Sequence, residues 1–76
     1  MTATLLLDNI DKVKEFVAIS RTRPYDVDLL SGKYIINGKS IMGIFGLDLT
    51  KPVTVSIAVD DTTFINEVSK FFYIEK

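Results

Sequence analysis

The chain contains neither histidine nor cysteine, and this removes a large part of enzyme chemistry from consideration. Histidine is the commonest general base near neutral pH, the commonest metal ligand and an acceptor of phosphoryl groups. Cysteine would supply a thiol nucleophile, a disulfide or a zinc ligand. Serine, carboxylates and basic side chains remain, and from them we predict no catalytic residue, no metal site and no cofactor.

One serine has a setting that could carry chemistry. Ser40 follows Lys39 and opens residues 40–47, a short apolar run interrupted twice by glycine. It stands where the N-cap of a helix belongs, and its hydroxyl can accept a backbone N–H of the first turn. Capping alone explains most such serines. A phosphate here would lie against free amides and the positive end of the helix dipole, so phosphorylation need not unfold the helix.

The run after Ser40 is apolar on nearly every side. A helix of two turns cannot direct all of these side chains into the core. Its large apolar residues are Ile41, Met42, Ile44, Phe45 and Leu47. We expect Ile44 and Leu47 to lie in the core. Met42 and Phe45 are expected to face a partner, because Met adapts to irregular surfaces and Phe buries a large area on docking. The alternative for both is simple core filling.

Two further clusters have ordinary explanations as well. Asp26 and Asp28 would share one strand face and could hold a cation, although two carboxylates alone make a poor calcium site and solvated strand charges are commoner. Arg21 and Arg23 could bind an anion beside Lys39, or simply form a solvated turn.

Hydrophobic periodicity and turn residues divide the chain into seven elements. The pattern predicts strands over residues 2–7, 25–29, 33–36 and 53–59, and helices over residues 10–20, 40–47 and from 60–63 onward. Asp8 or Asn9 can cap the first helix, which ends before Pro24. Residues 53–59 alternate most cleanly and should form a central strand.

Turn and packing signals complete this outline. Ser31-Gly32 predicts a hairpin. The last helix is expected to place one set of residues on a single face: Phe64, Ile65, Val68, Phe71 and Phe72. The order βαββαβα with one-sided strands favours an α+β fold, an antiparallel sheet covered on one face by helices. With 76 residues the chain is predicted to be one domain, residues 1–76.

Charge and composition limit the partners. The chain has 9 Lys+Arg and 10 Asp+Glu, so no net field attracts nucleic acid or anionic lipid. The N-terminal residues contain no signal-peptide pattern and no apolar stretch long enough to span a membrane. We expect a cytoplasmic protein that binds other proteins.

The block NGKSIMGIFGL, with YDVDL and SGK before it and TVSIA after it, resembles HPr, the phosphocarrier family of the bacterial sugar phosphotransferase system. The similarity runs from about residue 25 to residue 72 and extends to the whole chain by element order. It implies an open-faced β-sandwich, in which three helices cover one face of a four-stranded antiparallel sheet. The likeness is loose in the hairpin.

The phosphoacceptor site of HPr has no counterpart here. In the family a histidine lies in a G-I-H-A-R-P-like segment at the start of the first helix, where this chain reads LDNIDKVKEF. Asp8, Asn9 and Asp11 lie near the missing histidine. An aspartyl phosphate, with Asp11 as acceptor, is one alternative function, although it would require a metal and an acidic pocket.

The resemblance implies that the regulatory site of the family is retained. The resemblance matches Ser40 to the serine that HPr kinase phosphorylates in low-GC Gram-positive bacteria, after which the protein binds a catabolite control regulator. It matches Lys39 to the residue before that serine, and it matches Ile41, Met42 and Phe45 to the apolar patch that docks on partners. All four are expected to bind a partner. One relative in that group also lacks the histidine and keeps the serine.

Three positions depart from the family pattern: Phe45 replaces a methionine, Gly46 a serine, and Asp48 the glycine that usually ends the helix. The sequence therefore favours a non-catalytic, HPr-like regulatory protein with Ser40 as a candidate phosphorylation site. Its expected partners are HPr kinase, the catabolite control regulator or other phosphotransferase-system components. A domain repurposed for assembly, in which Ser40 is only a cap, is the other alternative.

Overall fold

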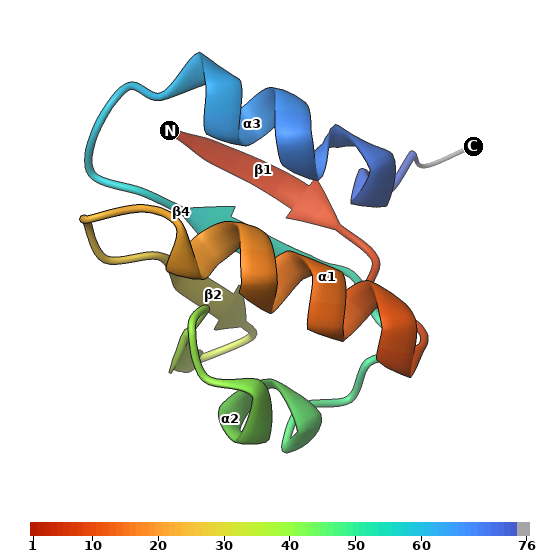
Figure 1. The fold of residues 1–76 in the computed structure, drawn as a ribbon. Helices are drawn as coiled ribbons and strands as arrows, with labels where there is room; N and C mark the ends of the chain where they lie inside the picture. The colour runs from red at the N-terminus through yellow and green to blue at the C-terminus, as the bar shows by residue number, and fades with distance from the viewer. Residues whose placement is uncertain (75–76) are drawn as a thin grey trace.

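The protein folds in the predicted order βαββαβα, and the computed structural model describes residues 1–74 (Figure 1). The elements are β1 (Thr2–Leu5), α1 (Ile10–Arg21), β2 (Asp28–Ser31), β3 (Tyr34–Asn37), α2 (Ile41–Phe45), β4 (Val53–Ser56), α3 (Thr62–Val68) and the 3-10 helix η1 (Ser69–Phe71). Among these described residues, none of the helices is both long and apolar enough to cross a membrane.

The four strands form one antiparallel sheet in the order β1-β4-β2-β3. Val55 on β4 lies opposite Ala3 on β1 and Leu29 on β2, so the prediction that this strand is central is confirmed. The hairpin predicted at Ser31-Gly32 joins β2 to β3, and Gly32 adopts φ 58°, a conformation that glycine enters without steric cost.

One face of the sheet carries the core and the other is polar. Leu5, Leu29 and Val55 are fully buried and pack with Phe16 of α1 and Phe64 of α3. The strand residues that alternate with this core are Thr2, Thr4, Thr54, Ser56 and Asp28, and all of them are exposed or half-buried. Because successive strand side chains point to opposite faces, helices cover one face only. The predicted α+β, open-faced architecture is therefore confirmed; Figure 1 shows α1 and α3 running past the strands and α2 below α1.

The strand boundaries differ from those predicted. The strand expected over residues 25–29 begins only at Asp28, because its ladder partners end there: Asp28 pairs with Ser56 on β4 and with Asn37 on β3. Val27 is buried just outside the strand, and its carbonyl accepts the Gly38 N–H at 2.6 Å. The strands expected over 2–7, 33–36 and 53–59 are likewise Thr2–Leu5, Tyr34–Asn37 and Val53–Ser56.

The last helix is also shorter than its apolar pattern indicated. The α-helix ends at Val68, and the chain then tightens into η1. Phe72 leaves the helical face and forms a bridge with Leu5, while Tyr73 N–H donates to Thr4 O at 2.9 Å. The free edge of β1 thus draws this segment out of the helix. Phe71 is buried as predicted, whereas Phe72 remains 40% exposed.

Candidate partner-docking site

Ser40 is the N-cap of α2, as predicted. Its backbone is extended, with φ −106° and ψ 105°, and its Oγ accepts the Gly43 N–H at 3.2 Å. The helix spans Ile41–Phe45, shorter than the 40–47 expected, because Gly46 N–H already bonds back to Gly43 O as the helix closes. The Ser40 hydroxyl is therefore engaged in holding the first turn and lies in a half-buried position.

The sides of α2 differ sharply in exposure. Ile44 is fully buried and Leu47 is half-buried against the core, as predicted for these two residues. Ile41, expected among the partner-binding residues, is also half-buried against the core. Met42 is 78% exposed and Phe45 40% exposed, so neither fills the core. The short helix therefore exposes two large apolar side chains within five residues of the serine that caps it.

Close backbone packing holds α2 in place. A Cβ added to Gly43 would lie 2.9 Å from Ile36 Cγ2 and 3.2 Å from Ser40 Oγ. Glycine therefore lets the helix approach β3 more closely than any other residue would. Glycine is a poor helix former, so this packing rather than intrinsic propensity keeps so short a helix formed.

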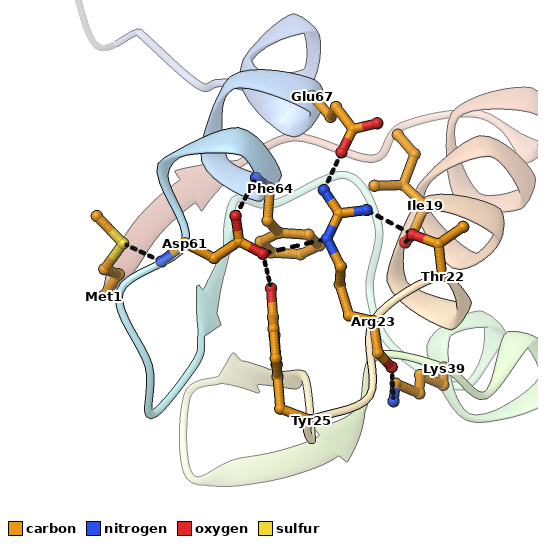
Figure 2. Close-up of polar contacts among 9 residues, drawn as sticks. All are labelled: Met1, Ile19, Thr22, Arg23, Tyr25, Lys39, Asp61, Phe64 and Glu67. Carbon is orange, nitrogen blue, oxygen red and sulfur yellow. Dashed lines mark hydrogen bonds and ion pairs between the residues drawn. The ribbon is translucent and has the colours of Figure 1, made fainter.

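Lys39, the residue before Ser40, is hydrogen-bonded to the end of α1 and to the segment that follows it. Arg21 Nε donates to Lys39 O at 3.1 Å. Lys39 Nζ donates to Arg23 O at 2.7 Å (Figure 2). Arg21 therefore lies beside Lys39, which is the proximity that an anion site at these residues would require. The Lys39 ammonium is directed toward the Arg23 carbonyl, which gives this residue a structural contact.

Arg23 does not provide the free cation that an anion site would need. Its Nε donates to Asp61 Oδ2 at 3.2 Å, another guanidinium nitrogen donates to Glu67, and its side chain is only 15% exposed. Tyr25 Oη donates to the same Asp61 oxygen at 2.7 Å, and the guanidinium lies 5.5 Å from the Phe64 ring centroid (Figure 2). The suggestion of an anion site at Arg23 is wrong, because two carboxylates already surround it.

We call these residues, Arg23, Tyr25, Asp61, Phe64 and Glu67, the Arg23 cluster. The sequence indicates the role of only one of them, Asp61. Residues 60–63 were recognised as N-cap candidates for the last helix, and Asp61 Oδ1 does accept the Phe64 N–H at 3.0 Å. Its pairing with Arg23, 38 positions earlier, leaves no local signal. The cluster joins the segment that follows α1 to the N-cap and body of α3.

Acid should weaken this cluster. The Phe64 N–H, then the Tyr25 hydroxyl and Arg23, lower the pKa of Asp61 below its ordinary value. A lowered pKa stabilises the fold above the unfolded-state value, about 3.9, and this contribution is lost as pH falls through the folded pKa. We expect the melting temperature to fall below about pH 4, and to fall less in Asp61→Asn, whose amide keeps a capping oxygen.

The control for this measurement is Asp60→Asn, which changes the exposed neighbouring carboxylate and should follow the wild-type pH profile. Melting temperatures recorded by circular dichroism between neutral pH and pH values below the unfolded pKa would test it. An Asp61→Asn profile parallel to that of the wild type would contradict the assignment.

The region of the missing histidine is occupied by ordinary helix-start contacts. Asn9 Oδ1 accepts the Lys12 N–H at 2.9 Å. Of the two predicted N-cap residues, Asp8 and Asn9, it is therefore Asn9 that caps α1. Lys12 Nζ bonds Asp8 at 2.8 Å, and this bond lowers the pKa of Asp8. Asp11 lies exposed in the first turn of α1.

The predicted pairing of Asp26 with Asp28 on one strand face is wrong, because β2 begins at Asp28 and Asp26 precedes it. Within residues 1–74 no group of three or more acidic, histidine or cysteine side chains is placed to hold a metal ion.

Comparison with known proteins relates the fold to one family. No protein-family model and no curated protein matches the chain. Among solved structures it is similar to the crystal structure of HPr-C-His from Thermoanaerobacter tengcongensis, with 20% sequence identity and a TM-score of 0.76. The match covers 92% of this chain and 88% of that one. The chain therefore has the fold of HPr, in agreement with the resemblance seen in its sequence.

Proposed function

We propose that this protein is a non-catalytic regulatory module of the sugar phosphotransferase system, in which α2 docks on protein partners and Ser40 is a phosphorylation switch. The observation that carries the proposal is the exposure of Met42 and Phe45 immediately after the serine cap. The partners are HPr kinase, the catabolite control regulator or other components of that system, and the site of action is the cytoplasm.

The docking surface consists of Met42 and Phe45, with Ile41 and Lys39 at its border. Exposing a large aromatic and a long thioether side chain to water is costly, and burial against a partner recovers that cost. Aromatic side chains often dominate the binding energy of protein interfaces, while methionine adjusts to partner shape. The buried Ile44 behind them fixes the orientation of the helix.

Phosphorylation of Ser40 is compatible with the local structure. A phosphate oxygen can replace Oγ as acceptor of the Gly43 N–H, so the cap need not be lost. The first turn of α2 contains no acidic residue that would repel the added charge. The Arg21 side chain contacts Lys39, the residue before Ser40. A change of its rotamer can bring the guanidinium toward a phosphate on Ser40.

Incubation with HPr kinase from a low-GC Gram-positive bacterium and ATP tests the switch. We expect the intact mass to increase by one phosphoryl group, and Ser40→Ala to abolish this increase. Ser69→Ala, which removes an exposed hydroxyl bonded to Asn66 O, is the matched control and should still be modified. Absence of any mass increase in the wild type would contradict the proposal that Ser40 is a phosphorylation switch. A mass increase that persists in Ser40→Ala would show that another residue is phosphorylated.

A further inference from the structure

A second feature of α2 lies on its other side, where the β2–β3 hairpin approaches the end of the helix. A hollow of about 560 Å³ opens there. Tyr34 and Ile36 line it from the hairpin, and Gly46 and Leu47 line it from the helix end. Met42 and Phe45 take no part in its lining, so the hollow is separate from the proposed docking surface.

The walls of this hollow are apolar and one of them is aromatic. Tyr34 is 61% exposed although its ring belongs to a strand, and Ile36 and Leu47 lie half-buried beside it. Gly46 contributes no side chain to fill the space. A ligand with a flat apolar body would cover the Tyr34 ring and the two aliphatic side chains together.

The rim of the hollow carries positive charge. Lys33 and Lys51 both line it and are both exposed. Within residues 1–74 the ion pairs of the structure involve other basic residues, Lys12, Arg23 and Lys70, and leave these two ammonium groups unpaired.

Asp48 also lines the hollow, and its negative charge offsets part of the positive charge of the two lysines. Its Oδ1 accepts the Thr50 N–H at 3.1 Å and the Thr50 hydroxyl at 2.6 Å. These bonds hold the carboxylate in its own turn, and they, followed by the nearby charge of Lys51, lower the pKa of Asp48. Two cationic side chains against one engaged carboxylate leave the rim with a net positive charge.

We propose that this hollow binds a small organic anion with a flat apolar body, such as an aromatic carboxylate. Its volume falls in the range of about 300–1,000 Å³ typical of small-molecule sites, which likewise combine apolar walls with a few polar groups. The apolar body packs on Tyr34 and Leu47, and the carboxylate faces Lys33 and Lys51. The inference does not depend on the phosphorylation of Ser40.

Titration with naphthoate, followed by proton–nitrogen correlation spectra of the labelled protein, tests the site. We expect saturable shifts of the amides of Gly32, Tyr34, Gly46 and Leu47. The neutral isostere naphthamide should bind about tenfold more weakly, because it keeps the apolar contacts and loses the charge pairing. Shifts confined to other parts of the chain, or equal affinities for both compounds, would overturn the proposal.

The double variant Lys33→Gln, Lys51→Gln separates charge pairing from simple apolar adhesion. Both residues lie on exposed turns, so the fold should be retained. Naphthoate should bind about three- to tenfold more weakly to this variant, while naphthamide binding stays unchanged. Lys14→Gln, an exposed charge change on α1, is the matched control and should leave both affinities as in the wild type. Unchanged naphthoate affinity in the double variant would contradict the role of the lysines.

Discussion

Replacing Met42 and Phe45 together by glutamine is expected to weaken binding to HPr kinase about 100-fold, equivalent to about 3 kcal/mol. The two side chains are 78% and 40% exposed in the free protein, so a partner is needed to bury them. Glutamine keeps much of the side-chain length but removes the apolar contact area. Isothermal calorimetry or surface-immobilised binding assays would measure the change.

The same double variant should fold normally. Neither side chain fills the core, and glutamine is a good helix former, so the melting temperature should change by only a few degrees. Ile35→Gln is the matched control, because Ile35 is 70% exposed but belongs to β3 rather than α2. It should leave the affinity unchanged. Undiminished kinase binding by the Met42 and Phe45 variant would exclude α2 as the docking surface.

Local signals in the sequence predicted the elements well. Each helix cap depends on contacts within three residues: Asn9 bonds Lys12, Ser40 bonds Gly43, and Asp61 bonds Phe64. Such contacts can be inferred from residue type and spacing alone. The exposure of Met42 and Phe45 was predictable for a related reason, because a helix of two turns has too little inward surface for every apolar residue it carries.

The features that depend on distant parts of the chain were not predictable in the same way. The start of β2 at Asp28 is set by where β3 and β4 end, and no property of residues 25–27 reveals this limit. The departure of Phe72 from the helical face follows from the free edge of β1, at the opposite end of the sequence.

The candidate sites show the same division. Ser40 and its apolar neighbours lie within one short segment, so the cap and the exposure of Met42 and Phe45, on which the proposed docking surface rests, could be predicted. The hollow joins the Lys33 turn to the Lys51 turn, and these turns come together through long-range contacts: the pairing of β2 with β4 and the packing of Gly43 on Ile36. The Arg23 cluster likewise assembles from the segment between α1 and β2 and from α3 with its N-cap.

The largest loss of stability is expected for Phe64→Ala. Phe64 is fully buried on α3, its ring meets Tyr25 edge-on at 6.3 Å, and the Arg23 guanidinium lies above it. Deleting a buried aromatic ring costs about 3–5 kcal/mol, since both apolar burial and packing are lost. Domains of this kind have a total stability of only about 5–15 kcal/mol, so this loss should remove a large share of the stability and move the urea midpoint well below that of the wild type.

Urea denaturation followed by circular dichroism would measure this loss, and two further variants separate its causes. Phe72→Ala removes the same ring from a site that is 40% exposed and should cost about 1 kcal/mol, in keeping with its incomplete burial. Phe64→Leu keeps most of the volume but removes the aromatic contacts, worth about 0.5–1.5 kcal/mol beyond burial, and should fall between the two. If Phe64→Ala lost no more stability than Phe72→Ala, then this ring would not be what anchors α3 to the core.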